Sequence, residues 1–251
     1  MSTRKPLVAG NWKMHGTRAE NSALVAAIVQ VLSGEENVEV VVCPPFVYLA
    51  DVVRAVKDTS VAVGAQNVCA EPMGAFTGEV AAAMLRDIGC RYVIVGHSER
   101  RQIYREDDAL VARKFLAVQL QKLIPILCVG ETLEERERAQ TEQVIARQLD
   151  AVLAVAGVAA LAQAVIAYEP VWAIGTGKNA TPEQAQAVHA FIRGRLARQD
   201  AKIAGAIRVL YGGSVKAANA GELFAMPDVD GGLVGGASLK GEEFMRICAA
   251  A

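Results

Sequence analysis

Three titratable side chains stand at the ends of short apolar runs in this sequence. Glu169 follows one run directly, and Lys13 and His97 each come within two residues of another. A carboxylate can remove a proton from carbon, an imidazole can exchange protons with oxygen, and an ammonium group can stabilise a developing negative charge. If folding brings the three together, they form a site for acid–base chemistry.

Glu169 and His97 also have simpler interpretations. Glu169 precedes Pro170, which favours an extended backbone, and its carboxylate could form a salt bridge at the rim of a sheet as readily as it could act as a general base. An isolated histidine is more often packed or hydrogen-bonded than catalytic. His97, however, precedes Ser98-Glu99-Arg100, which could begin a helical turn whose positive dipole end favours a neutral imidazole.

Lys13 comes two residues after Asn11, where an extended segment would point both side chains inward. A lysine is otherwise most often a solvated surface residue. The remaining histidines, His15 and His189, have no comparable neighbours, and we assign them no catalytic role.

Two glycine pairs could bind an anion. Gly212-Gly213-Ser214 and Gly235-Gly236 follow the last two apolar runs, and glycine lets backbone amides approach a phosphate closely. Each pair alone indicates only a tight turn, but two in consecutive turns favour a phosphate site. The segment Val171–Asn179, which contains Trp172, is typical of a mobile lid with an apolar anchor.

The elements that must position these residues recur along the whole chain, as short apolar runs that alternate with stretches of helical period. Runs that are apolar throughout are typical of parallel strands buried on both faces. The predicted strands are Leu7–Asn11, Val38–Cys43, Val61–Ala65, Tyr92–Val95, Ile124–Val129, Ala164–Tyr168, Arg208–Tyr211 and Gly232–Val234.

Helix signals lie between the predicted strands. Threonine followed three residues later by glutamate or glutamine predicts a capping box, in which the two side chains satisfy free backbone amides. The run Leu133–Leu153 suits a solvated outer helix. The predicted boxes pair Thr17 with Glu20, Thr132 with Glu135, and Thr181 with Gln184.

Eight strand–helix units without a linker rich in Pro, Gly or Ser predict one domain, residues 1–251, folded as a single α/β structure, the (β/α)8 barrel with eight parallel strands. A doubly wound sheet is the alternative, but the first turn reads Gly10-Asn11-Trp12-Lys13 in place of the usual G-x-G-x-x-G fingerprint. In a barrel, the loops at the carboxyl ends of the strands carry the active site, which is where the residues named above stand.

The composition excludes several classes of protein. Of 251 residues, 53% are hydrophobic and 21% charged, and the net charge is −1, so the chain is globular and has no overall field for nucleic acid or an anionic membrane. Five cysteines without metal-ligand spacing predict buried free thiols in a reducing, cytoplasmic compartment. The uncharged stretch Ala151–Tyr168 contains Gly157 and predicts a helix end, a turn and a strand start, not a membrane span.

Six motifs, in this order along the chain, together resemble the triosephosphate isomerase family and cover essentially the whole length. They are Gly10-Asn-Trp-Lys-Met14, Val95-Gly-His-Ser-Glu-Arg100, Pro125-Ile-Leu-Cys-Val-Gly-Glu131, Ala167-Tyr-Glu-Pro-Val-Trp-Ala-Ile-Gly-Thr-Gly-Lys178, Tyr211-Gly-Gly-Ser214 and Leu233-Val-Gly-Gly-Ala-Ser238. The resemblance implies an isomerase of glycolysis and gluconeogenesis that interconverts dihydroxyacetone phosphate and D-glyceraldehyde 3-phosphate through an enediolate. It implies no metal and no organic cofactor.

The resemblance also implies a role for each site residue. Glu169 would remove the carbon-bound proton, His97 would polarise the carbonyl and move protons between oxygens, and Lys13 would stabilise the enediolate. Asn11 would line the pocket. The residues that would bind the substrate phosphate through backbone amides are Gly175, Ser214, Gly235 and Gly236.

The family is typically homodimeric, and the segment Gln66–Glu79 resembles the loop that inserts into the partner subunit. The segment could instead be an ordinary surface loop, although Met73 and Phe76 at its tip would be awkward on a monomer. Three residues depart from those common in the family, and their effects on dimer strength and lid motion stay open: His15, Ala81 and Asn179.

Two other functions remain open. One is an isomerase or epimerase for a larger sugar phosphate, against which the complete lid motif argues, because a lid of this type suits a three-carbon substrate. The other is a catalytically silent phosphate-binding barrel. The presence of Lys13, His97 and Glu169 together argues against that function.

Overall fold

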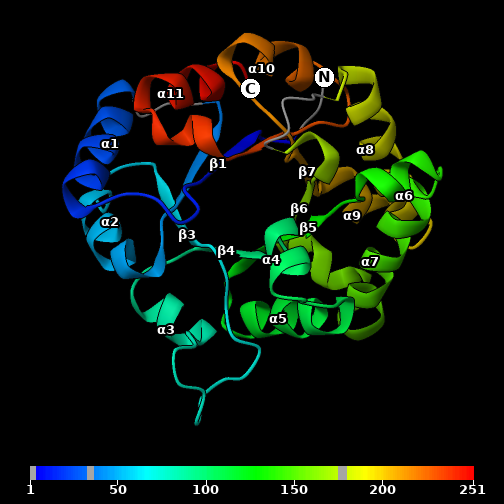
Figure 1. The fold of residues 1–251 in the computed structure, drawn as a ribbon, viewed down its shortest axis with the longest axis horizontal. Coiled ribbons are helices and arrows are strands. Elements are labelled where there is room, and N and C mark those ends of the chain that lie inside the picture. The colour runs from blue at the N-terminus through cyan, green and yellow to red at the C-terminus, as the bar shows by residue number, and fades with distance from the viewer. Residues whose placement is uncertain (1–3, 33–36, 175–179) are drawn as a thin grey trace.

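Eight parallel strands close into a barrel in chain order, and the helices form a ring around it (Figure 1). This computed structural model describes residues 4–32, 37–174 and 180–251. The first strand pairs with the last, with Leu7 beside Gly231, and this pairing closes the sheet. The strands are β1 (Leu7–Asn11), β2 (Glu39–Cys43), β3 (Ala62–Ala65), β4 (Tyr92–Val95), β5 (Ile124–Val129), β6 (Val165–Tyr168), β7 (Arg208–Tyr211) and β8 (Gly231–Val234).

The predicted (β/α)8 barrel is confirmed, and every predicted strand is present with its ends within one residue of the prediction. The helices are α1 (Arg18–Val31), α2 (Leu49–Ala55), α3 (Ala82–Asp87), α4 (Ser98–Ile103), α5 (Asp108–Leu120), α6 (Leu133–Glu137), α7 (Thr141–Ala156), α8 (Pro182–Ala197), α9 (Ala201–Ala206), α10 (Ala217–Phe224) and α11 (Gly241–Ala249).

One predicted helix is wrong in its extent. The run Leu133–Leu153 forms two helices, α6 and α7, because the chain turns between them, where Ala139 takes a left-handed φ of 55°. The stretch Ala151–Tyr168 holds the end of α7, a turn at Gly157, a short 3-10 helix and β6, as predicted. Among the described residues, no helix is both long and apolar enough to cross a lipid bilayer.

Two of the three predicted capping boxes form in full. Thr132 with Glu135 and Thr181 with Gln184 exchange hydrogen bonds in both directions. Thr17 caps α1 by accepting a hydrogen bond from the Glu20 amide, without the reciprocal contact.

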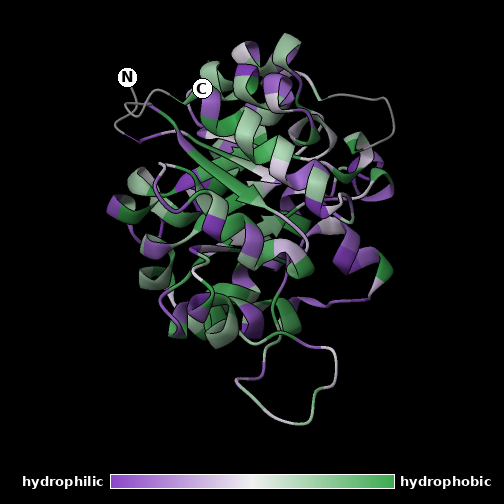
Figure 2. Cartoon of the chain, turned by 90° about the vertical axis from the view of Figure 1, so that its left-hand side faces the viewer, coloured by the Kyte–Doolittle hydropathy of each residue, from purple (hydrophilic) through white to green (hydrophobic). Residues whose placement is uncertain are grey.

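The strands bury both of their faces, which is why they read as continuous apolar runs. In β1, Leu7 and Ala9 belong to the cluster that fills the barrel, whereas Val8 belongs to the cluster between the strands and the surrounding helices. Figure 2 shows the hydrophobic residues concentrated on the strands, whereas the helices carry both hydrophobic and hydrophilic residues. The two clusters decide which face of each strand points into the barrel. Because all the pairings are parallel, polar residues just beyond the carboxyl ends of the strands meet at one mouth of the barrel.

The segment Gln66–Glu79 leaves this compact body as a loop between β3 and α3 (Figures 1 and 2). Its tip carries Met73, which is 80% exposed, and Phe76, which is 46% exposed. The tip of this loop therefore presents two large apolar side chains to solvent.

Candidate active site

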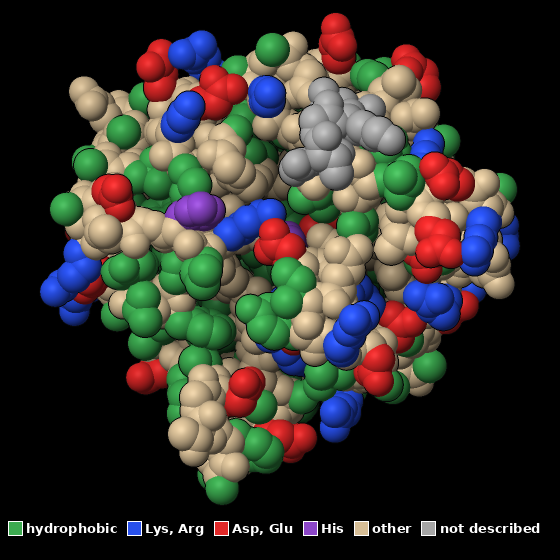
Figure 3. Space-filling model, viewed as in Figure 1, with side chains coloured by type: hydrophobic (Ala, Val, Ile, Leu, Met, Phe, Trp, Pro, Cys, Tyr) green, Lys and Arg blue, Asp and Glu red, His purple; other side chains and the backbone are tan. Residues whose placement is uncertain are grey.

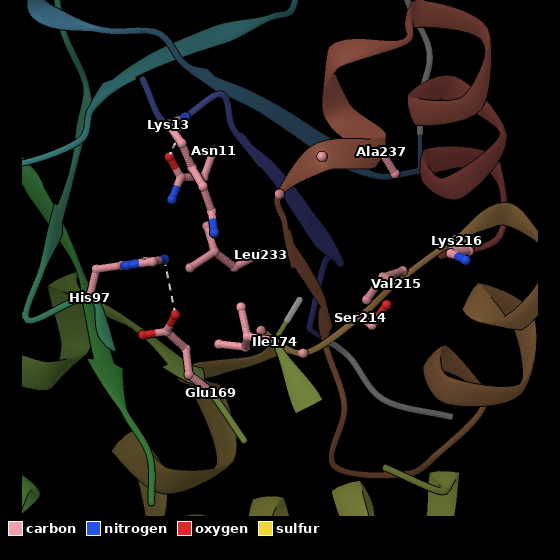
Figure 4. A pocket seen from close by; sticks show the side chains of 14 residues that line it. Asn11, Lys13, His97, Glu169, Ile174, Ser214, Val215, Lys216, Leu233 and Ala237 are labelled. Atoms are coloured by element: carbon pink, nitrogen blue, oxygen red, sulfur yellow. Dashed lines mark hydrogen bonds and ion pairs between the residues drawn. The ribbon is translucent and has the colours of Figure 1, made fainter. Parts of the chain in front are cut away.

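A cavity of about 280 Å³ opens at the carboxyl ends of the strands. Figure 3 shows this face hollowed at its centre, where basic, acidic and histidine side chains lie beside one another. In Figure 4, Asn11, Lys13, His97 and Glu169 lie on one side of the cavity, opposite Ser214 and Ala237. The ends of three strands supply the first group and two glycine-containing turns supply the second, so residues far apart in the sequence share one pocket.

Asn11 and Lys13 belong to the end of β1, His97 follows β4, and Glu169 follows β6. The opposite side of the cavity comes from the turns after β7 and β8.

The His97 ring has a defined tautomer. Its Nδ1 accepts a hydrogen bond from the Glu99 amide at 3.2 Å, at the start of α4. A backbone amide can only donate, so Nδ1 carries no proton and the ring is a neutral imidazole with its proton on Nε2. The predicted helical turn is therefore present. Its Glu99 amide holds Nδ1 of the His97 ring, and this orients the ring so that Nε2–H points into the cavity.

The Glu169 carboxylate is buried and held by three donors. The Ser98 amide donates to Oε2 at 2.8 Å, the Ser98 hydroxyl donates to Oε1 at 3.0 Å, and His97 Nε2 lies 3.0 Å from the same Oε1. The Glu169 side chain is 2% exposed, so these bonds replace the water that a carboxylate would otherwise bind. In this arrangement the carboxylate rests against Ser98 and the imidazole.

Close backbone approaches make room for Glu169. A Cβ atom on Gly130 would lie 1.8 Å from the Glu169 carbonyl oxygen, and one on Gly212 would lie 2.9 Å from Glu169 Cγ. Both positions therefore require glycine. Beneath the carboxylate, burial raises the pKa of the Cys128 thiol well above its usual value, and the charge of Glu169 with a hydrogen bond to it raises the pKa further.

Lys13 is held in an unusual backbone conformation. Its φ is 52°, so the segment is not extended at this residue as predicted, yet Asn11 and Lys13 both line the cavity. Two side chains fix the turn: Asn11 Oδ1 accepts from the Lys13 amide at 3.0 Å, and Gln66 Nε2 donates to the Lys13 carbonyl at 2.8 Å. The ammonium group forms an ion pair of 2.5 Å with Glu99 Oε1.

The two glycine turns form the opposite wall. Gly213 and Ser214 line the cavity after β7, and Gly235 and Gly236 line it after β8. The Gly212 amide donates to the Tyr168 carbonyl at 2.7 Å, so this amide is already used within the protein. A Cβ on Gly213 would lie 2.2 Å from the Tyr211 hydroxyl oxygen, which explains the second glycine of that pair.

A buried carboxylate stands behind the segment that follows Glu169. Glu131 is fully buried and accepts hydrogen bonds on Oε1 from the Tyr168 hydroxyl at 3.0 Å and from Trp172 Nε1 at 2.9 Å. Arg136 lies 3.2 Å from the same oxygen and stacks over the Trp172 ring at 4.4 Å. Trp172 is thus anchored at the start of the predicted lid.

The structure brings together seven of the site residues predicted from the sequence. Gly175 lies outside the described residues, and so does Asn179, one of the three residues that depart from those common in the family. His15 is exposed and His189 is buried beside Tyr168 and Tyr211, and neither lines the cavity. The seven that line the cavity are Asn11, Lys13, His97, Glu169, Ser214, Gly235 and Gly236.

Sequence reasoning missed the residues that position the others. Ser98 was predicted only as part of a helical turn, Cys128 only as a buried thiol, and Gln66 only as the start of a loop. Ser98 had a usable signal, because it directly follows His97 at a strand end. Gln66 and Cys128 had none, because their contacts reach residues distant in the sequence. Among the described residues, no cluster of His, Cys, Asp and Glu could hold a metal ion.

A polar pocket at the carboxyl ends of a closed parallel barrel puts the chain among the (β/α)8-barrel enzymes. A family model of triosephosphate isomerase matches residues 6–251. The triosephosphate isomerase of Thiobacillus denitrificans is 66% identical over 248 residues, which are 99% of either chain. Those of Nitrosomonas eutropha and Pseudomonas putida are 60% and 55% identical over 249 residues, again 99% of either chain.

The chain belongs to the triosephosphate isomerase family, and it is an isomerase. The resemblance drawn from the six motifs is thereby confirmed.

We expect the two buried histidines to be opposite tautomers near neutral pH. The Glu99 amide requires an unprotonated Nδ1 on His97, whereas the Asp228 carbonyl, 3.1 Å from Nδ1 of His189, requires a proton there. Long-range proton–nitrogen NMR spectra distinguish the two forms, and a His15→Gln variant assigns the third ring. The same tautomer at both buried positions would contradict the geometry.

The same spectra test the pH response of His189. Burial lowers the pKa of this ring to about 4, so we expect it to stay neutral in the folded protein as the pH falls from about 8 to about 5. The unfolded chain has the ordinary histidine pKa of about 6.5 and binds a proton in this window, so the free energy of unfolding should fall as the pH falls. Protonation of His189 at a pH near 6 in the folded protein would contradict this.

Proposed function

We propose that this isomerase interconverts dihydroxyacetone phosphate and D-glyceraldehyde 3-phosphate, by transfer of a proton through Glu169 and an enediolate intermediate. One observation carries the proposal. A carboxylate, a neutral imidazole and an ammonium group share a cavity of about 280 Å³ with two glycine turns on its opposite side. The first group suits proton transfer beside a carbonyl, and the second suits a phosphate.

Proton transfer begins at Glu169. A proton beside a carbonyl is weakly acidic, so the base needs a partner that stabilises the charge developing on oxygen. His97 supplies it, because its Nε2–H faces the cavity and can donate to the carbonyl oxygen. In the free site this donor is 3.0 Å from Glu169 itself, so a bound carbonyl would take over the donor and leave the carboxylate free to act as the base.

Lys13 supplies the positive charge for the enediolate. Its side chain is 26% exposed, and its ammonium group is paired with Glu99, whose side chain is 42% exposed. An ion pair with this much exposure to water is weak, so an anionic ligand in the cavity can compete with Glu99 for the ammonium group. Asn11 holds the turn that aims Lys13 and lines the cavity beside it.

The phosphate would lie against the glycine turns, on the side away from Glu169. Backbone amides of Ser214, Gly235 and Gly236 would bind it, together with Gly175, which lies outside the described residues. Amides bind a dianion without a net positive charge, which suits a chain whose net charge is −1. The proposal includes no metal and no organic cofactor, because these side chains and amides suffice for the proton transfers.

The size of the cavity favours a three-carbon substrate. Small-molecule sites usually measure about 300–1,000 Å³, and this cavity lies just below that range. An isomerase or epimerase for a larger sugar phosphate is the alternative, and an assay with D-glyceraldehyde 3-phosphate separates the two. A catalytically silent phosphate-binding barrel would not need the buried hydrogen bonds that orient His97 and Glu169.

We place this reaction in the cytoplasm, as a step of glycolysis and gluconeogenesis. All five cysteines are free and buried, which is typical of proteins kept in a reducing compartment. The family to which the chain belongs supports the metabolic role.

We also propose that the chain forms a homodimer through the loop Gln66–Glu79. A second cavity of about 340 Å³ lies beside the catalytic side chains and is lined in part by Lys13, His97 and Glu99. Large apolar side chains surround this region, and the loop of a second copy could fill the cavity and cover them. Those that line the cavity are Met14, which is 92% exposed, Tyr104, which is 64% exposed, and Phe46, which is 37% exposed.

Replacing the base tests the reaction directly. We expect Glu169→Gln to lower kcat by roughly 10²–10⁴-fold, the usual contribution of a positioned acid–base group. A coupled assay with D-glyceraldehyde 3-phosphate measures the rate, and Glu142→Gln, at an exposed position of α7, is the matched control. A wild-type protein inactive on this substrate would refute the proposed function, and full activity in Glu169→Gln would remove Glu169 from it.

A charged substitution at the tip of the loop Gln66–Glu79 tests whether this loop forms the proposed dimer interface. We expect Phe76→Glu to raise the dissociation constant of the dimer by about 100-fold, because a buried aromatic anchor would become an uncompensated charge. Sedimentation velocity at micromolar concentrations measures the change. Leu120→Glu, which adds the same charge at a 78% exposed position of α5, should leave the dimer intact. A wild-type protein that sediments as a fully active monomer would contradict the proposal.

A further inference from the structure

Three charged side chains line the substrate cavity in the described part of the chain, and only two of them belong to the proton transfer. The three are Lys13, Glu169 and Lys216. Lys216 comes two residues after Ser214, beyond the glycine turn that follows β7. In Figure 4 it lies on the side of Ser214, across the cavity from Glu169. A cation therefore stands on the wall that would receive the phosphoryl group.

The backbone of Lys216 is held next to Ser214. Asn219 Nδ2 donates to the Ser214 carbonyl at 3.1 Å, and Asn219 Oδ1 accepts from the Lys216 amide at 2.8 Å. The next amide, that of Ala217, donates to Glu243 Oε1 at 2.9 Å. Both amides at the start of α10 are thus used within the protein. The part of this helix start that meets the cavity as a charged group is the Lys216 side chain.

The ammonium group of Lys216 is available to a ligand. The residue is exposed, and no ion pair formed between described residues includes it. Lys13 differs in this respect, because its ammonium group is paired with Glu99. An anion that approaches Lys216 has only water to displace, whereas one that approaches Lys13 has to compete with a carboxylate.

The charges on the side of the proton transfer do not favour a dianion. Lys13 supplies a positive charge there, but two carboxylates face it, its partner Glu99 and the proposed base Glu169. Since the His97 ring is neutral, this side carries a net negative charge. Lys216 adds a positive charge on the opposite side and so offsets the repulsion that a phosphoryl group would meet on entering.

Lys13 and Lys216 lie at different edges of the phosphate wall. A Cβ atom on Gly235 would lie 3.4 Å from Lys13 Cε and 3.9 Å from Lys13 Nζ, so the turn after β8 runs beside the Lys13 ammonium group. Lys216 follows the other turn, the one that contains Ser214. An anion bound by the amides of both turns would therefore have an ammonium group at each edge.

We propose that Lys216 is the second cation of the phosphate site, which draws the phosphoryl dianion into the cavity and holds it opposite Lys13. The inference takes the identity of the substrate from the proposed function. Because Lys216 lies across the cavity from Glu169, its contact with the phosphoryl group is the same before and during the proton transfer. An interaction of this kind lowers KM and leaves kcat nearly unchanged.

Three variants of the full-length protein test the role of the charge. Lys216→Met removes the charge and keeps the length of the side chain, and Lys216→Arg keeps the charge. Lys202→Met is the matched control, because Lys202 is exposed on α9, which precedes β7 and lies at the other end of the barrel. Assays at an ionic strength of about 0.01 M, where screening is weak, give KM and kcat for D-glyceraldehyde 3-phosphate and the inhibition constant of inorganic phosphate.

We expect Lys216→Met to raise both KM and the inhibition constant of inorganic phosphate by roughly tenfold, the scale of one ammonium group beside a dianion at a surface open to water. The kcat of this variant should stay close to that of the wild type. Lys216→Arg and Lys202→Met should stay close to the wild type in all three quantities.

Unchanged constants in Lys216→Met would overturn the proposal, as would an equal rise in Lys202→Met or a loss confined to kcat. A titration with inorganic phosphate followed by phosphorus NMR measures the same contact without turnover. If the wild-type protein gives no isomerised product but Lys216→Met still weakens phosphate binding, the proposed function fails and the role of Lys216 stands. The two failures are therefore distinguishable.

Discussion

The site depends on the hydrogen bonds that hold the Glu169 carboxylate in a buried position. A buried charge is tolerated only when donors replace its water, and a hydrogen bond to a charged group contributes about 1.5–3 kcal/mol. Ser98 and His97 supply the donors from the end of β4, whereas Glu169 stands at the end of β6, with β5 between them. The closed barrel is what sets this spacing, and Gly130 and Gly212 leave the space that it requires.

In the free site, the polar side chains are paired with one another, and these pairings link substrate binding to catalysis. His97 donates toward Glu169, Lys13 is paired with Glu99, and Ser98 holds both oxygens of the base. A substrate has to replace the first two contacts, and in doing so it releases the base from its imidazole partner. In the proposed reaction, a ligand that offers a carbonyl oxygen to His97 and negative charge to Lys13 makes both exchanges. The proposal therefore attributes part of the selectivity to contacts that exist before the substrate arrives.

The sequence predicted the barrel closely, because strands buried on both faces leave continuous apolar runs that are visible without any tertiary information. It also predicted which chain positions meet at the barrel mouth, since parallel strands place their carboxyl ends together. It failed where the backbone departs from regular geometry. Lys13 takes a left-handed φ that no local pattern signals, and the run after Thr132 breaks at Ala139 for the same reason. Gln66 acts on Lys13 from 53 positions away, a contact that only the folded chain creates.

A crystal structure of the protein with a stable, phosphorylated mimic of the enediolate tests the central claim most directly. The account predicts the phosphoryl group against the amides of Ser214, Gly235 and Gly236, with the Nε2 of His97 on the oxygens of the mimic. It also predicts that the Glu169 carboxylate has left Ser98 and lies over the reacting carbons. A mimic bound in the opposite direction, or a Glu169 carboxylate still held by Ser98 and facing away from the mimic, would contradict the account.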